Sequence, residues 1–344
     1  MSEFIQIHVL TAYPPSNANR DDMGRPKTAV IGGVSRLRIS SQCLKRTWRV
    51  SDVFTTALAG NIGTRTKLLG NEVFKKLVDK KISEKLAKEW AQAIAGVFGK
   101  LKSDSLEIEQ LVHVSPQEIT AIDELIEKIA SEKRAPEANE LNLLRKDIQA
   151  ADIAMFGRML ASSPSNNMDA AIQVSHAFSV ARYLEEDDYF TAVDDLNKSE
   201  DDQGSAHIGE AGFGSGIYYL YICINKSLLI ENLQNNTDLA NKSIKALTEA
   251  ALTLAPSGKQ NSFASRVRAS YAIAEKGTLQ PRSLAAAFFK PVTDEDHINV
   301  AINSLVQQRN NMDMSYGKCY SADYVFNPHN GKGTLNELLG FVAN

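Results

Sequence analysis

Apolar and polar residues alternate at the start of the chain and then give way to a helical spacing. In residues 4–11 nearly every second side chain is apolar, which predicts a strand with one buried side. Between residues 71 and 100 the apolar side chains recur three and four positions apart, which predicts two helices. Ser115 and Glu118 have the spacing of a capping box and predict that another helix begins there. A further helix is predicted over residues 137–149.

Strand patterns return in the second half of the chain. The segments predicted as strands there include 152–160, 172–182, 189–196 and 213–224. The last two are predicted to be the arms of a long hairpin, joined by an acidic, glycine-containing connection at 197–212. Helices and strands alternate without the regular spacing of doubly wound units, so the pattern favours an α+β fold on a mixed or antiparallel sheet. The mostly helical residues 50–150 are predicted to be an insertion.

Residues 35–49, SRLRISSQCLKRTWR, predict a short strand, a serine pair and an amphipathic helix. Ser40 or Ser41 suits the N-cap, because a hydroxyl there can accept from the free N–H groups of the first turn. Leu44 and Trp48 point to the side that would pack on a sheet. The opposite face carries four polar side chains at helical spacing: Gln42, Lys45, Arg46 and Arg49. This pattern predicts a phosphate-binding surface, and the alternative is a basic face that is merely solvated.

The distribution of charge favours the phosphate-binding interpretation. The 344 residues have a net charge of −3, with 43% hydrophobic and 23% charged residues, as in an ordinary globular protein. Residues 1–50 nevertheless carry eight Lys and Arg against three Asp and Glu, which indicates a local anionic partner. The long loop at residues 13–33 adds Arg20, Arg25 and Lys27 beside the basic helix, and loops of this length are usually functional or disordered.

Several classes of protein are excluded by the absence of their patterns. The three cysteines, Cys43, Cys223 and Cys319, are scattered and form no CxxC pair, which predicts neither a disulfide framework nor a zinc site. The histidines share no ligand spacing, and nucleotide-binding or hydrolase motifs are missing. We therefore expect no cofactor, no metal and no catalytic residue. No signal peptide or membrane-spanning stretch is evident, so we expect a cytoplasmic protein.

Two acidic groups leave alternatives open. Asp21 and Asp22 could hold a metal ion for phosphodiester cleavage, although the plainer interpretation is that they pair with Arg20 and Arg25 and order the loop. Asp194 and Asp195, together with residues 185–188 and 200–202, make the hairpin region strongly acidic. It is either a solvated excursion or a surface that meets basic residues on another copy of the chain, head to tail.

Three apolar or aromatic side chains near the hairpin have two interpretations. Tyr189 and Phe190 stand beside acids at its base, and Met159 follows Arg158 in FGRML. Most residues of this kind belong to a core. In a protein that holds a single strand, however, they can act as wedges between bases or as stacking platforms.

The runs NRDDMGRPKTAVIGGVSRLRISSQCLKRTWR, DIAMFGRM, FTAVDDL, GSAHIG and FGSGIYY together resemble a known family. It is the backbone subunit (CasC, RAMP superfamily) of Cascade, the type I-E CRISPR surveillance complex. The resemblance is dense over residues 1–49 and 151–225 and looser elsewhere. It implies an RRM-like (ferredoxin-like) palm at 1–49 and 151–344. It also implies helical fingers inserted at 50–150 and a β-hairpin thumb at 185–224.

The resemblance also implies roles for individual residues. It assigns to the RNA backbone Arg20, Lys27, Ser40, Gln42, Lys45, Arg46, Arg49 and Lys259. It assigns base wedging or stacking to Met159, Tyr189 and Phe190, although Tyr189 stands where the family pattern has Trp.

The implied function is that of a non-enzymatic scaffold that polymerises along a CRISPR RNA and presents its spacer in segments for pairing with target DNA. The implied partners are CRISPR RNA, target DNA, further copies of the chain and other Cascade subunits, without a membrane. Two alternatives remain: a metal-dependent ribonuclease that uses Asp21 or Asp22, and a protein-only scaffold whose basic helix binds an acidic partner.

Overall fold

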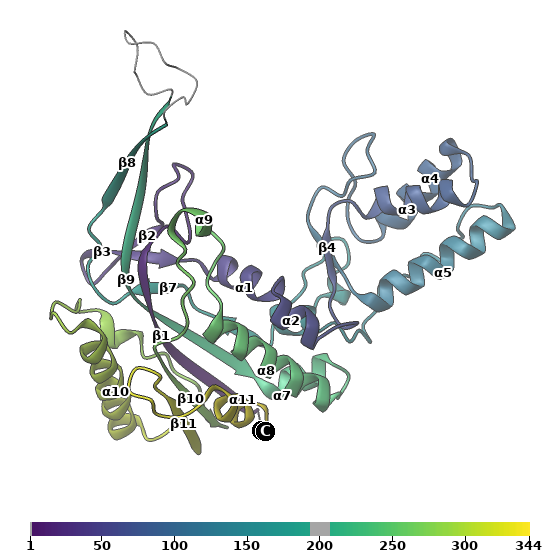
Figure 1. The fold of residues 1–344 in the computed structure, drawn as a ribbon. Coiled ribbons are helices and arrows are strands. Elements are labelled where there is room, and N and C mark those ends of the chain that lie inside the picture. Colours follow the sequence, from purple (N-terminus) through teal and green to yellow (C-terminus); the bar gives the residue numbers. More distant parts are fainter. Residues whose placement is uncertain (1, 193–206) are drawn as a thin grey trace, which may run out of the picture. The chain divides into compact units, whose positions relative to one another are not determined.

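The computed structural model describes residues 2–192 and 207–344 and confirms the predicted α+β fold (Figure 1). Its backbone divides into two compact units. The first, here called the helical unit, contains Phe54–Gln173 and Ile224–Ala246. The second, the sheet unit, contains Glu3–Val53, Val174–Cys223 and Leu247–Asn344. The helical unit therefore includes the predicted insertion at 50–150 from residue 54 onward, together with two later segments.

The sheet unit holds most of the strands. Its elements are β1 (Phe4–Ser16), β2 (Thr28–Ile31), β3 (Val34–Ile39), α1 (Ser41–Arg49), β7 (Ala177–Ser179), β8 (Glu186–Ala192), β9 (His207–Asn225, whose last two residues belong to the helical unit), α9 (Gln260–Phe263), β10 (Tyr271–Gly277), the 3₁₀ turn η2 (Ala285–Phe288), α10 (His297–Tyr316), β11 (Ala322–Phe326) and α11 (Leu335–Ala343).

Within the described part of the chain, nine strands form one sheet in the order β11-β10-β1-β9-β7-β3-β2, with β6 (Ile172–Val174) and β8 paired to β9. Strand β1 runs antiparallel to β10. The prediction of one buried side for β1 is wrong, because Gln6 and His8 are 2% and 0% exposed. Both find polar partners on neighbouring β9, where Tyr221 Oη donates to Gln6 Oε1 and His8 Nδ1 lies 2.9 Å from Tyr219 Oη.

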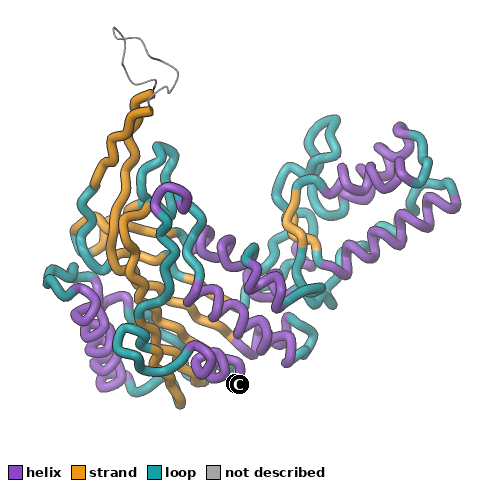
Figure 2. The backbone as a smooth tube through the Cα atoms, in the orientation of Figure 1, coloured by secondary structure: helices purple, strands orange, loops and turns teal. Residues whose placement is uncertain are grey.

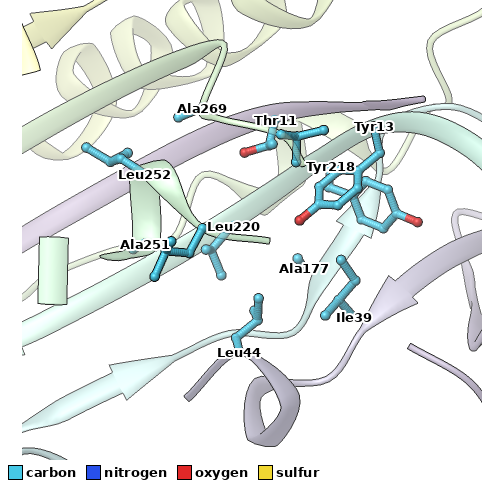
Figure 3. Close-up of a pocket in the computed structure, with 12 residues that line it drawn as sticks. Thr11, Tyr13, Ile39, Leu44, Ala177, Tyr218, Leu220, Ala251, Leu252 and Ala269 are labelled. Carbon is cyan, nitrogen blue, oxygen red and sulfur yellow. The ribbon is translucent and has the colours of Figure 1, made fainter. Parts of the chain in front are cut away.

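Both faces of this sheet are packed. On one face Phe178, Tyr219 and Ile273 meet η2 and α10 in a single apolar cluster. On the other face Leu44 of α1 and Ala251 of α8 (Thr237–Thr253) line a small cavity of about 20 Å³ (Figure 3). Helix α1 is therefore seated directly on the sheet.

A buried arginine on β3 connects the end of the sheet to β7 and to η2. The Arg36 side chain is fully buried and donates to the carbonyl oxygens of Ser179 at 3.0 Å and Phe288 at 3.1 Å. Burial lowers the pKa of Arg36. In the adjacent β2–β3 turn, Gly32 approaches the same segment, because a Cβ there would lie 1.7 Å from Phe289 O.

The helical unit is built around a core of its own. Its elements are β4 (Thr64–Thr66), α3 (Leu69–Asp79), α4 (Glu84–Gly96), β5 (Val112–Val114), α5 (Pro116–Glu132), α6 (Ala151–Phe156), the 3₁₀ turn η1 (Pro164–Asn166) and α7 (Lys226–Asn232); α2 (Asp52–Ala57), β6 and α8 contain residues of both units. The core includes Leu77, Trp90, Ile94, Ile126 and Ile129. No helix among the described residues is long and apolar enough to cross a membrane.

Local sequence patterns predicted some helices of the helical unit correctly and others not. The capping box at the start of α5 is confirmed, since the side chains of Ser115 and Glu118 each accept from the other's backbone N–H. The predicted strand at 152–160 is wrong, because residues 151–156 form α6. Ala151 to Met155 are buried on every side, and such a run has no periodicity to separate helix from strand. The predicted helix at 137–149 is also wrong, since these residues form turns and irregular backbone.

The predicted hairpin is confirmed within the described residues. Strands β8 and β9 pair in register from Glu186 opposite Phe213 to Ala192 opposite His207, and Figure 2 shows them side by side. The prediction that 207–212 belong to the connection is wrong, since they are part of β9. The glycines there allow close packing rather than a turn. Residues 193–206 lie outside the described residues. They include the end of the predicted first arm, the rest of the predicted connection and the acidic residues 194–195 and 200–202.

The β2–β3 turn provides a test of the packing at Gly32. Gly32→Ala should lower the free energy of unfolding by about 1–3 kcal/mol or more, because φ is +61° and the new Cβ would overlap Phe289 O. Gly33→Ala is the matched control, since it also has a positive φ of +79° but has no atom within 4 Å of the added Cβ. Urea unfolding of both variants measures the difference, and equal destabilisation would contradict the close approach at Gly32.

Candidate nucleic-acid interface

Helix α1 has the amphipathic structure that its sequence predicted. Ser40 is the N-cap, and its hydroxyl accepts from Cys43 N at 3.3 Å. Leu44 and Trp48 are 4% and 0% exposed and anchor the helix to the sheet unit. The predicted polar residues occupy the other side, with Gln42 and Arg46 exposed and Lys45 and Arg49 half-buried. Burial lowers the pKa of Lys45.

The loop before β2 is tied to the N-terminus of this helix. Asn19 Oδ1 accepts from the backbone N–H of Ser40 at 2.9 Å. Asn19 O accepts from Lys27 N at 2.8 Å, and Lys27 O accepts from Arg38 N at 2.7 Å. The charge of Lys27 acts on the Cys43 thiol, where it opposes the rise in pKa that burial causes. Lys27 therefore lies beside the first turn of α1, and exposed Arg20 follows Asn19 directly.

Two further contacts connect this loop to other elements of the sheet unit. The amide of Asn17 donates to Gly24 O within the loop and to Gly212 O of β9, both at 2.9 Å. Gly258 packs against Ala18, because a Cβ at Gly258 would lie 2.5 Å from Ala18 O. Lys259 comes next in the chain, is exposed and precedes α9. The fold thus brings Lys259 to the same loop despite the long separation in sequence.

The acidic residues of the loop serve its local structure. Asp21 Oδ1 accepts from the backbone N–H groups of Met23 at 3.0 Å and Arg25 at 2.9 Å. Arg25 pairs through its side chain with Glu185, whose charge raises the pKa of Arg25. The carboxylate of Asp21 thus orders the loop through backbone donors. Among the described residues, no group of three or more His, Cys, Asp or Glu side chains is arranged to hold a metal ion.

The two aromatic residues of β8 point to opposite sides of the hairpin. Phe190 pairs with Gly209, and its ring lies over that glycine, where a Cβ would be 2.3 Å from Cζ. Tyr189 pairs with Glu210 and shares its face with Gly212, which lies against Pro26 of the loop before β2. Tyr189 is 65% exposed and Phe190 is 44% exposed. Tyr189 is therefore the member of the pair on the side that faces the loop.

The residues proposed for the RNA backbone all belong to one of the two units. The sheet unit contains all eight: Arg20, Lys27, Ser40, Gln42, Lys45, Arg46, Arg49 and Lys259. Met159 belongs to the helical unit, where it is 79% exposed.

Comparison with known proteins assigns the chain to a family. The family model of the CT1975-like proteins matches residues 5–338. The chain belongs to this family. A comparison with curated proteins finds no match. A chain of a solved "CRISPR RNA-guided surveillance complex, pre-nicking" is similar over 99% of both chains, with a TM-score of 0.83 and 27% identity. A chain of a solved "CRISPR RNA-guided surveillance complex" has a TM-score of 0.71 and 24% identity over 96% of this chain and 93% of that one, and shows the same fold.

In this CT1975-like protein, sequence reasoning missed the residues that position the cationic groups. Asn17, Asn19 and Gly258 carry no charge and match no motif, yet they join the loop to β9, α1 and the segment that holds Lys259. Their role depends on contacts between distant segments, which local patterns do not encode. The one signal in the sequence was the asparagine content of the loop, which is typical of local side-chain-to-backbone bonding.

The bond between Asn19 and Ser40 can be tested in this CT1975-like protein. Asn19→Ala should speed hydrogen exchange of the Ser40 amide about fivefold, since a net hydrogen bond contributes about 1 kcal/mol. The Met23 amide, which is bonded to Asp21, should keep its protection and serves as the internal control. Unchanged exchange at Ser40 would show that Asn19 does not hold the loop to the helix.

Proposed function

We propose that this chain is an RNA-binding scaffold subunit of a CRISPR RNA-guided surveillance complex of the type I-E Cascade kind. It polymerises along the guide spacer, grips its sugar–phosphate backbone and presents the bases in segments for pairing with target DNA. It is not an enzyme, and it acts in the cytoplasm. Membership of the CT1975-like family and similarity to a chain of a surveillance complex support this proposal.

One observation carries the proposal: the cationic groups are fixed around the capped N-terminus of α1. Asn19 connects that N-terminus to the loop that bears Arg20 and Lys27, and Gly258 connects the loop to the segment that bears Lys259. Helix N-termini bind phosphate through free N–H groups and the helix dipole, and lysine and arginine side chains add charge that salt screens.

This surface would grip RNA without reading its sequence. The groups in it are ammonium, guanidinium, hydroxyl and backbone N–H groups, which suit phosphate oxygens. Sequence would then be read by base pairing between guide and target, while the protein recognises the backbone, as in other RNA-guided effectors. Repeated copies could therefore bind any spacer.

Exposed acidic residues where the hairpin leaves the sheet support a contact between copies of this chain. Glu185, Asp187 and Asp188 are exposed, and Glu185 forms an ion pair with Arg25 of the same chain. A cationic surface on one copy and an acidic surface on another are complementary in charge. Such a contact joins different surfaces of the two partners, so it leaves one of each surface unpaired and can continue from copy to copy. It builds an open chain of subunits where the rotation between copies does not close a ring.

The first experiment measures nucleic acid in the purified complex. The ratio of absorbance at 260 and 280 nm should show bound nucleic acid, and extraction should give RNA of defined length that ribonuclease destroys. Material free of nucleic acid that nonetheless assembles would favour a protein-only scaffold and overturn the proposal.

Removal of two charges from α1 tests recognition of the backbone. Lys45→Ala with Arg46→Ala should weaken guide binding equally for all spacer sequences. The slope of log affinity against log salt should fall by about 0.7 for each phosphate that the variant no longer neutralises. Lys85→Ala with Lys88→Ala removes the same charge from the exposed side of α4 and is the control. A weakening that depends on spacer sequence would contradict backbone recognition.

The hairpin aromatics can be separated because they occupy opposite faces. Tyr189→Ala should weaken RNA binding by the equivalent of about 1–3 kcal/mol if its ring stacks on a base. Phe190→Ala should weaken RNA binding less, since its ring already covers Gly209. Fluorescence anisotropy with labelled guide RNA measures both variants. A larger effect of Phe190→Ala would show that RNA contacts the other face of the hairpin.

A further inference from the structure

A buried ion pair in the helical unit lies directly beside the exposed Met159. Arg158 Nη1 donates to both carboxylate oxygens of Glu118, at 2.9 and 2.8 Å, and the two side chains are 1% and 0% exposed. Glu118 also accepts from the backbone N–H groups of Ser115 at 2.8 Å and Arg145 at 3.0 Å. One carboxylate thus joins the start of α5, the segment at Arg145 and the loop that carries Met159.

The residues on both sides of Met159 are fixed by further hydrogen bonds. The backbone of Arg158 pairs with Met168 in both directions, at 3.0 and 2.9 Å. Leu160 is 2% exposed, and its N–H donates to Asn167 Oδ1 at 2.6 Å. Gly157 precedes Arg158 with a φ of +81°, a conformation that favours glycine. The backbone that carries Met159 is therefore constrained at every neighbouring position.

Met159 is exposed, although the residues on both sides of it are buried. Its side chain is 79% exposed between two buried neighbours. A buried arginine bound to a carboxylate is costly to desolvate, and such pairs contribute little net stability compared with apolar packing. An ion pair that is costly to desolvate and lies beside an exposed methionine therefore indicates a role in positioning that methionine side chain.

We propose that Arg158 and Glu118 are positioning residues that hold Met159 ready for insertion between two bases of the bound strand. This inference rests on the proposed function, in which the chain grips RNA. Apolar side chains, methionine among them, act as wedges that unstack bases. A wedge on a mobile loop would lose conformational freedom on insertion, whereas a fixed loop has already lost it.

The chemistry of the pair explains why arginine occupies position 158. Its planar guanidinium reaches Glu118 while Nη2 donates to the carbonyl oxygens of Arg145 at 3.2 Å and Asn166 at 3.3 Å. A lysine would keep the charge but could not direct donors to these separate acceptors at once. Arg158→Lys should therefore fold with a loosened loop.

The test uses the full chain assembled on guide RNA that carries 2-aminopurine, a base whose fluorescence rises when it is unstacked. Assembly of the unaltered chain should raise fluorescence at particular spacer positions, and Met159→Ala should abolish the rise. Arg158→Lys and Asn167→Ala should each lose most of the rise while retaining RNA affinity, because the cationic residues of the sheet unit are unchanged. Asn167 is exposed, so its variant loosens the same loop without removing a buried charge.

A second measurement separates positioning from a general effect on folding. In the RNA-free chain with labelled methionine methyl groups, both variants should move the Met159 resonance toward its value in an unfolded peptide. Met314, in the sheet unit and also 77% exposed, should keep its resonance. A moved Met159 resonance together with a full fluorescence rise would overturn the positioning role and leave the proposed function intact. A rise that Met159→Ala leaves unchanged would overturn the wedge, while RNA in the purified complex would still support the scaffold.

Discussion

Two asparagine side chains hold the cationic surface of the sheet unit together. Asn17 bonds to Gly212 of β9, and Asn19 bonds to the backbone N–H of Ser40, the N-cap of α1. Without these bonds, the loop that carries Arg20 and Lys27 would lose its side-chain attachments to β9 and to the N-terminus of α1. Since an unordered loop must lose conformational entropy when it binds, a loop that is attached beforehand has less entropy to lose on contact with a ligand.

The sequence predicted α1 because every local signal there agreed. A capping serine, two apolar anchors and a polar stripe at helical spacing all describe the same helix, and Leu44 and Trp48 are buried as expected. The prediction for residues 151–156 was wrong for the opposite reason, because their apolar and polar residues show no helical period. Their helical structure follows from burial on all sides, which is a property of the fold rather than of the segment.

The excess of positive charge in residues 1–50 predicted the region of the candidate surface but not its members. Arg36 is buried and bonded to backbone carbonyl oxygens, and Arg25 is paired with Glu185. A count of charges treats these residues like Arg46, which is exposed. In the same way, adjacent positions in the sequence suggested one role for Tyr189 and Phe190, whereas strand geometry places them on opposite faces.

The cavity beneath α1 has a consequence for how firmly that helix is seated. It measures about 20 Å³, roughly the space of one water molecule, and Leu44 forms part of its lining (Figure 3). Hydrostatic pressure favours states in which internal voids are filled by solvent. Pressure that drives water into this cavity would therefore loosen the packing of Leu44, and with it the contact between α1 and the sheet.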